Sequence, residues 1–167
     1  LAKSWKRINS TTWEFNLRKG IKFHNGEDFN SKAVKFTFDR LLDPNQKSPQ
    51  SFLWAPSDMS GGLDRVEIIN AHKVQFITSG PFGALLATLP LAFIMPPVAG
   101  ASGDYGTKGY GTGPFKVRKF NSQKGLFLES NPAYWGGEPK LNELNFIPLL
   151  ESSTRVSALR AGDIDII

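Results

Sequence analysis

The sequence predicts a mixed α/β fold of the α+β kind, built from antiparallel hairpins and a few helices. Apolar and polar residues alternate over 13–26 and again over 64–78, a period of two that is typical of half-buried strands. Residues 30–44 and 152–162 have the helical period instead. With 167 residues, 40% hydrophobic and 21% charged, the chain is long enough for one globular domain or for part of a larger one.

The first predicted element is a hairpin at residues 13–26, whose sequence is WEFNLRKGIKFHNG. Its pairs Lys-Gly and Asn-Gly are typical of tight turns, because Gly and Asn tolerate positive φ. A helix is predicted over residues 30–44, with Asn30 as the N-cap and Pro44 as the stop signal.

Loop and hairpin signals then follow up to a long connector. In order, the sequence predicts a loop at 45–62, strands at 64–70 and 72–78, a short helix at 81–89 and a Gly-rich connector at 95–114. The composition of the connector predicts a boundary within it, so that residues 1–105 and 106–167 form two subdomains.

The second subdomain is predicted to contain a hairpin and the clearest helix of the second half. Its elements are strands at 115–120 and 125–130, a turn at 131–137, a strand-like run at 141–150 and a helix at 152–162. Ser152 or Ser153 is expected to cap that helix. Val156 and Leu159 are expected to face inward, and Gly162 to end the helix. The final DIDII has the pattern of a beginning strand which, with the missing initiator Met, favours a fragment of a longer chain.

The residue types that catalysis or metal binding needs are not found at useful spacings. The absence of cysteine excludes a disulfide framework and a thiolate nucleophile. His24 and His72 have no second ligand at metal-binding spacing. Asp163 and Asp165 are interpreted as polar residues at a strand entry rather than as a general acid/base pair. Since the glycines of GYGTGP also lack the Lys-Ser/Thr of a phosphate-binding loop, the sequence predicts no enzyme, no cofactor and no metal.

Positive charge gathers in the first quarter of the chain. The formal net charge is +5, and residues 1–40 carry nine Lys/Arg against four Asp/Glu, whereas the remainder is balanced at eleven each. This leaves a nucleic-acid- or surface-binding module as one alternative. Because the charges alternate with apolar residues along predicted strands, a solvated strand face is favoured and no nucleic-acid partner is expected. A secreted hydrolase is a second alternative, suggested by the aromatic residues and the paired aspartates.

Two aromatic residues in the 45–62 loop, Phe52 and Trp54, occupy positions where the local pattern does not demand burial. A covering role over the core is the favoured interpretation. The alternative is a platform that faces a ligand, because aromatic rings offer a large contact area at low entropic cost.

Three stretches of the chain resemble one known family, in order. The first is the hairpin-then-helix segment at 1–44, with Leu-Arg-x-Gly followed by Lys-Phe-His-x-Gly. The second is GTGPFKV at 111–117, and the third is 128–167, with Asn-Pro-x-Tyr-Trp-Gly and a closing Leu-x-x-Gly-x-x-Asp. These motifs are similar to those of the extracytoplasmic solute-binding proteins of ABC importers, family 5, which serve oligopeptide, dipeptide and nickel import.

The resemblance implies a type II periplasmic-binding-protein fold, in which two lobes close on a ligand. It implies that residues 1–105 are an accessory subdomain of the first lobe, that residues 106–167 are part of its main sheet, and that the second lobe is absent.

The resemblance also implies a receptor that captures a small solute, foremost an oligopeptide, outside the cytoplasmic membrane and delivers it to permease subunits. A periplasmic or other cell-envelope location follows, and nickel, a sugar or an opine is the alternative solute. Within this chain, the expected ligand contacts are Phe52 and Trp54 in the loop and Tyr110 and Thr112 in the connector.

Overall fold

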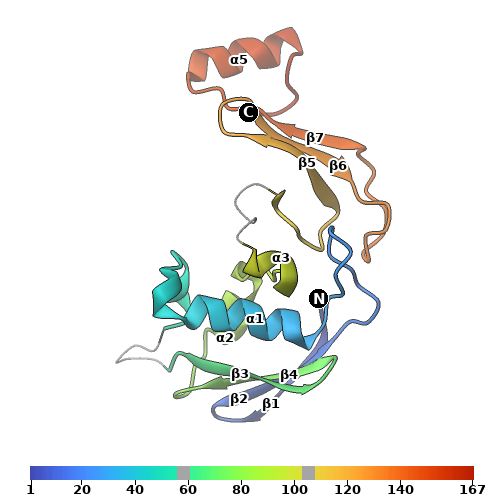
Figure 1. The fold of residues 1–167 in the computed structure, drawn as a ribbon. Helices are drawn as coiled ribbons and strands as arrows, with labels where there is room; N and C mark the ends of the chain where they lie inside the picture. The colour runs from blue at the N-terminus through green and yellow to red at the C-terminus, as the bar shows by residue number, and fades with distance from the viewer. Residues whose placement is uncertain (56–60, 103–107) are drawn as a thin grey trace. The chain divides into compact units, whose positions relative to one another are not determined.

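The computed structural model describes residues 1–55, 61–102 and 108–167. Contacts divide the chain into two compact units, Leu1–Thr112 (unit 1) and Gly113–Ile167 (unit 2) (Figure 1). This division falls later in the chain than the predicted boundary at 105/106, and the assignment of the two parts to subdomains of one lobe stays a prediction. The mixed α/β class is confirmed, because each unit combines an antiparallel sheet with at least one helix.

Unit 1 is built on a four-stranded antiparallel sheet with strand order β1-β2-β4-β3. Its strands are β1 (Ala2–Asn9), β2 (Thr12–Leu17), β3 (Leu63–Asn70) and β4 (Lys73–Thr78). The β3–β4 hairpin confirms the prediction for that part of the chain. The predicted hairpin at 13–26 is wrong in its second half, since β2 pairs with β1 and β4 and only a single bridge, Lys22–Asp28, forms beyond it.

Helix α1 (Ser31–Leu42) covers one face of this sheet and contacts β3 and β4 (Figure 1). The predicted cap is confirmed, because the side chain of Asn30 accepts a hydrogen bond of 2.8 Å from the backbone N–H of Lys32. Edge-to-face rings join the layers: the centroid of Phe38 lies 4.9 Å from that of Phe76 on the sheet and 5.2 Å from that of Trp54.

The core of unit 1 gathers apolar side chains from the sheet, from α1 and from the loops between them. The buried members are Phe15, Leu17, Ile21, Phe23, Phe29, Ala33, Val34, Phe38, Trp54, Leu63, Val66, Val74, Phe76, Leu85 and Ala92. Every one of these residues belongs to unit 1.

Short helices complete unit 1. They are η1 (Pro44–Gln46), η2 (Ser51–Leu53), α2 (Leu85–Thr88), η3 (Leu89–Leu91) and α3 (Pro97–Ala101). Helix α2 is shorter than the predicted helix at 81–89. Helix α3 lies inside the predicted connector, where Pro97 is compatible with a first helical turn because that position needs no backbone donor.

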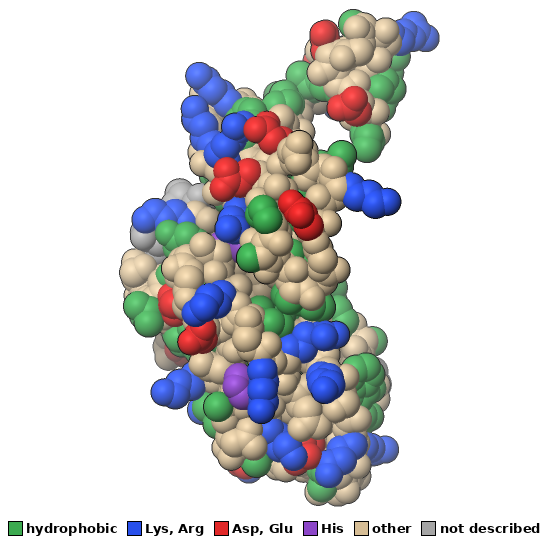
Figure 2. Space-filling model, turned by 90° about the vertical axis from the view of Figure 1, so that its right-hand side faces the viewer, with side chains coloured by type: hydrophobic (Ala, Val, Ile, Leu, Met, Phe, Trp, Pro, Cys, Tyr) green, Lys and Arg blue, Asp and Glu red, His purple; other side chains and the backbone are tan. Residues whose placement is uncertain are grey.

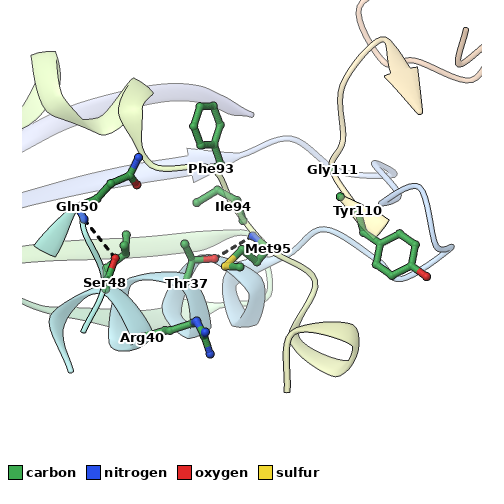
Figure 3. A pocket seen from close by; sticks show the side chains of 11 residues that line it. Thr37, Arg40, Ser48, Gln50, Phe93, Ile94, Met95, Tyr110 and Gly111 are labelled. Atoms are coloured by element: carbon green, nitrogen blue, oxygen red, sulfur yellow. Dashed lines mark hydrogen bonds between the residues drawn. The ribbon is translucent and has the colours of Figure 1, made fainter. Parts of the chain in front are cut away.

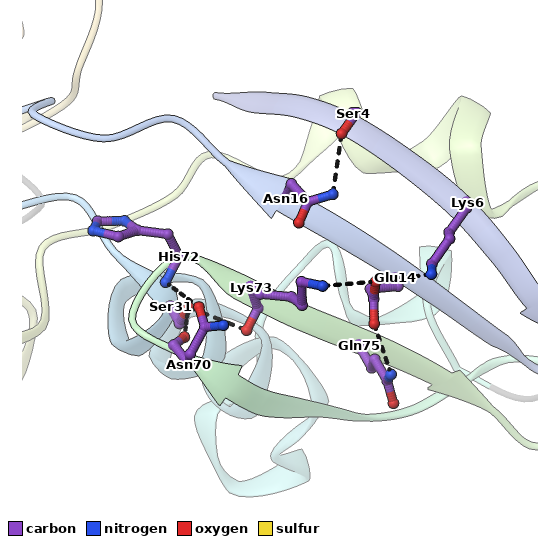
Figure 4. Close-up of polar contacts among 9 residues, drawn as sticks. All are labelled: Ser4, Lys6, Glu14, Asn16, Ser31, Asn70, His72, Lys73 and Gln75. Atoms are coloured by element: carbon purple, nitrogen blue, oxygen red, sulfur yellow. Dashed lines mark hydrogen bonds and ion pairs between the residues drawn. The ribbon is translucent and has the colours of Figure 1, made fainter.

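The opposite face of the sheet carries a polar cluster around Glu14 (Figure 4). The Glu14 carboxylate is buried by its neighbours and lies 3.1 Å from Lys73 Nζ, 3.2 Å from Gln75 Nε2 and 3.4 Å from Lys6 Nζ. The hydrogen bonds from Lys73 and Gln75 hold the pKa of this carboxyl below its ordinary value, against the opposing effect of burial. Within the basic first quarter, Lys6 is 64% exposed on this strand face, in line with the favoured interpretation of a solvated face, and it also pairs with Glu14.

Unit 2 consists of a three-stranded antiparallel sheet and one longer helix. The strands β5 (Phe115–Asn121), β6 (Gly125–Ser130) and β7 (Glu143–Phe146) lie in the order β5-β6-β7, which confirms the predicted β5–β6 hairpin. Asn131 is buried and fixes the following turn, because its backbone N–H donates to Pro114 O (2.8 Å) and its side-chain Nδ2 to Gly113 O (3.1 Å).

Helix α5 (Ser152–Ala161) ends at Gly162 as predicted, with φ of 80° and a hydrogen bond from Asp163 N to Ala158 O. Its N-terminal residue has no side-chain cap, so the predicted Ser cap is wrong. Val156 and Leu159 are exposed rather than inward-facing, because no other element of unit 2 covers that side of the helix. The expected strand in the final DIDII does not form within the described structure.

Candidate ligand-binding pocket

Unit 1 contains a pocket of about 450 Å³, a size typical of sites for small solutes. Three segments line it: the second half of α1 with the loop that follows, the segment after η3, and the connector that ends unit 1 (Figure 3). The larger apolar lining side chains are Leu41, Phe93, Ile94, Met95 and Tyr110. The polar lining side chains are Thr37, Arg40, Ser48 and Gln50.

The first wall depends on Thr37, whose hydroxyl is buried between α1 and the segment after η3. Thr37 Oγ1 donates to Ala33 O (2.8 Å), as a helical threonine often does, and accepts from Met95 N (3.0 Å) (Figure 3). A buried N–H without a partner would be costly, so this hydroxyl fixes Met95 against the helix. The same helix carries Arg40 one turn later on the side that lines the pocket.

The second wall is the extended segment that carries Phe93 and Ile94. Phe93 is 76% exposed although it is a large apolar side chain, and its ring stands at the pocket. Just beyond this segment, the Glu27 carboxylate accepts hydrogen bonds from Val98 N (2.9 Å) and Ala99 N (3.0 Å) in the first turn of α3. Partial burial raises the pKa of Glu27, but these bonds and one from Asn25 outweigh it, so the pKa lies below its ordinary value.

The third wall, around Tyr110, is held by a reciprocal pair of hydrogen bonds. His24 N donates to Gly111 O (2.9 Å), and Gly111 N donates to His24 Nδ1 (3.3 Å). The turn at residues 22–28 thus anchors the connector through His24 and α3 through Glu27. This gives His24 a structural role, and no group of three or more potential metal ligands exists among the described residues.

Of the predicted ligand contacts, the structure places Tyr110 in the pocket lining and the other three outside it. Trp54 is 0% exposed and packs edge-to-face on Phe38, so it has the core-covering role and offers no surface to a ligand. Its Nε1 has no hydrogen-bond partner within the described part of the chain. Phe52 is 73% exposed on η2 and does not line the pocket, nor does Thr112.

Sequence reasoning missed Arg40 and Phe93. Arg40 had the ordinary appearance of a cation in the last turn of a helix, where it favours the helix dipole. Phe93 lies in the apolar run LPLAFIMPPVA, which prolines divide. An apolar segment that prolines prevent from forming a regular helix or strand was the available signal for an exposed lining segment.

In the described part of the lining, apolar side chains adjoin a single charged side chain, Arg40, and no acidic one. Apolar walls with a few polar groups at their edges are an arrangement that suits the binding of a small solute. No helix of the described chain is long and apolar enough to span a membrane.

Comparison with known proteins identifies the class. The family model for bacterial extracellular solute-binding proteins, family 5 (Middle), matches residues 1–167, and the chain belongs to this family. It is 30% identical to di/tripeptide-binding protein 2 of Pseudomonas aeruginosa, over 99% of this chain and 35% of that protein.

Solved structures agree with this assignment. The chain superposes with a TM-score of 0.87, at 26% identity, on MoaA of A. tumefaciens R10 in complex with mannopinic acid, over 99% of this chain and 34% of that one. On DppA of Helicobacter pylori in complex with the peptide STSA the TM-score is 0.78 at 27% identity, over 98% of this chain and 36% of that one. The expected type II periplasmic-binding-protein fold is thereby confirmed, and the chain spans about a third of the length of these relatives.

Proposed function

We propose that the protein is the solute receptor of an ABC importer, which captures peptides outside the cytoplasmic membrane and delivers them to the permease subunits. The observation that carries this proposal is the pocket of unit 1, whose described lining combines apolar side chains with the cation Arg40, in a chain of the solute-binding family. Peptides are the solutes proposed because a relative is named as a di/tripeptide-binding protein and a similar structure holds a peptide.

In this role the protein acts by binding and release, without catalysis, and works in the periplasm or cell envelope. Peptide receptors gain affinity without sequence choice when they bind the peptide main chain and leave side chains in roomy pockets. The pocket of unit 1 is proposed to be one such side-chain pocket. Tyr110 and Phe93 are its proposed ligand contacts, Thr112 stays a secondary candidate, and Phe52, which lies outside the lining, is proposed to make no contact.

An opine is the second candidate solute, because a structure similar to this chain holds mannopinic acid. Opines are amino-acid derivatives that carry carboxylates, and those of the mannopinic acid type also carry hydroxyls, so they lack the repeating main chain of a peptide. The polar lining residues Ser48, Gln50 and Arg40 offer donors for such groups.

The first experiment is a thermal unfolding series on the full-length protein that carries this sequence, with di- to pentapeptides, opines, short sugars and a nickel chelate. A ligand at a hundredfold excess over its Kd stabilises the native state by about 2.7 kcal/mol, which gives a readable rise in Tm. A rise with peptides alone is expected. A rise with opines but not with peptides would replace the peptide with the second candidate, and no rise with any of them would overturn both.

Two exposed phenylalanines of unit 1 provide a matched test of the pocket. Phe93 lines it at 76% exposure, whereas Phe52 is 73% exposed and lies outside the lining. In the full-length protein, Phe93→Ala is expected to weaken peptide binding by about tenfold, the order expected for an aromatic contact. Phe52→Ala is expected to leave affinity unchanged, and the reverse result would move the contact surface to η2.

The 167-residue chain alone is expected to bind any solute much more weakly than the full-length protein. Ligand sites of this size usually bury most of the ligand surface, and this chain, about a third of the length of its relatives, offers only part of that contact. Titration calorimetry of the chain with the best peptide would test this, since micromolar or tighter binding would contradict it.

A further inference from the structure

Arg40, a partly buried residue of α1, contributes a cationic side chain to the lining of the pocket. Within the described residues it forms no hydrogen bond or ion pair, although carboxylates lie close to it in the sequence. Asp39 pairs with Lys35 Nζ at 2.9 Å, and Asp43 accepts hydrogen bonds from Asn45 and Gln46. Both neighbouring acids are therefore engaged elsewhere.

Several other basic residues of unit 1 form ion pairs with carboxylates, which Arg40 does not do within the described residues. Lys6 and Lys73 pair with Glu14, and Lys22 pairs with Asp28. Arg65 pairs with the acidic residues on either side of it. Arg40 forms no ion pair within the described residues, so an anionic ligand in the pocket would supply the partner that its guanidinium lacks there.

The rest of the lining determines which anion fits. Among the lining residues that the structure describes, none is acidic and Arg40 is the single cation. One guanidinium matches the charge and the planar shape of one carboxylate, which it binds through two parallel N–H···O bonds. The apolar side chains of Phe93, Ile94 and Met95 would contact the hydrocarbon next to that carboxylate.

We propose that Arg40 binds a carboxylate of the captured solute and that the protein therefore selects solutes in which this carboxylate adjoins an apolar group. This inference rests on the proposed solute-receptor function and adds the chemical feature that the pocket of unit 1 recognises. In a peptide, the carboxylate comes either from the C-terminus or from an acidic side chain, and in an opine from the acid groups of the molecule.

The experiment measures affinity of the full-length protein by titration calorimetry, with two pairs of peptides. One pair differs only in a C-terminal carboxylate or carboxamide, and the other only in a Glu or Gln side chain. The unmodified protein is expected to prefer the acid of at least one pair by roughly tenfold to hundredfold, the range of one charge-assisted hydrogen-bonded pair. Arg40→Gln is expected to abolish that preference while leaving affinity for the neutral peptide nearly unchanged.

Arg65→Gln is the matched control, because Arg65 lies on β3, outside the pocket lining, and pairs with Asp64 and Glu67. It is expected to leave the preference intact. Should Arg40→Gln fail to fold, Arg40→Lys is the test: it keeps the charge but not the planar fork, and is expected to keep only part of the preference.

The peptide pair whose acid preference is lost in Arg40→Gln shows whether the carboxylate comes from the C-terminus or from an acidic side chain. A preference that survives Arg40→Gln, or an equal loss of affinity for the acid and the neutral peptide, would overturn the role of Arg40 and leave the receptor function standing. Failure of the unmodified protein to bind any peptide or opine would instead overturn the proposed function and this inference with it.

Discussion

Units 1 and 2 differ most in what they bury. Unit 1 encloses a core of aromatic and aliphatic side chains between its sheet and α1. In unit 2 the buried residues are Gly125 and Asn131, and no large apolar side chain of that unit is fully buried. Leu150, at 91%, and Ile166, at 85%, are almost fully exposed.

The difference shows that a segment can form regular secondary structure without enclosing a hydrophobic core. Both units form regular hydrogen-bonded sheets, yet a three-stranded sheet with one helix has too few residues on its apolar side to exclude water by itself. Unit 2 is about the length at which a domain that folds by itself is only marginally stable. We therefore expect the stability of the chain to reside in unit 1.

The most severe test separates the two units. Residues 1–112 expressed alone are expected to unfold in one cooperative transition with urea, because the whole core is retained. Residues 113–167 alone are expected to show no cooperative transition, because no large apolar side chain is fully buried there. Circular dichroism in the far and near ultraviolet would measure both, and a sharp transition in residues 113–167 would contradict the comparison.

A pair of phenylalanines sharpens the same comparison within the intact chain. Phe38→Ala removes a buried ring that contacts Phe76 and Trp54, and is expected to lower the free energy of unfolding by about 3–5 kcal/mol. Phe120→Ala, on the exposed surface of β5, is expected to change it by less than about 0.5 kcal/mol. Urea titration followed by tryptophan fluorescence measures both, and equal losses would show that unit 2 has a core of its own.

A smaller effect is expected at the junction between α1 and the pocket wall. Thr37→Val keeps the shape of the side chain but removes the hydroxyl that accepts from Met95 N, and is expected to lower the free energy of unfolding by about 1–3 kcal/mol. Thr37→Ser keeps the hydroxyl and is the control, expected to lose less. The urea midpoints of both variants measure this, and a Val variant as stable as the parent would show that the bond contributes nothing.

The smallest predicted effect depends on pH. Because the pKa of Glu27 is lowered in the folded state, its carboxylate contributes stability above its ordinary pKa, and this contribution is lost as the pH falls through the lowered pKa. Glu27→Gln is expected to cost less than about 1 kcal/mol at neutral pH, since the site is partly exposed to solvent. The cost should disappear in acid, where the carboxyl is protonated in both states. Urea midpoints across this pH range measure the difference, and a cost that does not change with pH would contradict the assignment.

Several elements followed from local sequence alone. The alternation in β2, β3 and β4, the Asn30 cap of α1 and the Gly162 end of α5 were all predicted. These features depend on neighbours within a few residues, where the period of apolar positions and the φ angle of a turn residue decide the outcome. For the same reason, the class of fold and the family were readable from the sequence.

Contacts between distant residues required the tertiary structure. Only the fold pairs β2 with β1 and places Trp54 in the core instead of on a ligand-facing loop. Two hydrogen bonds between distant residues hold the pocket together. One joins Met95 to Thr37, 58 residues apart, and the other joins Gly111 to His24, 87 residues apart. No local period encodes such pairs, because which apolar surfaces meet depends on how all the elements pack together. The sequence by itself predicted β2 to β7, α1 and the family; only packing decided which side chains, Arg40 and Phe93 among them, line the pocket.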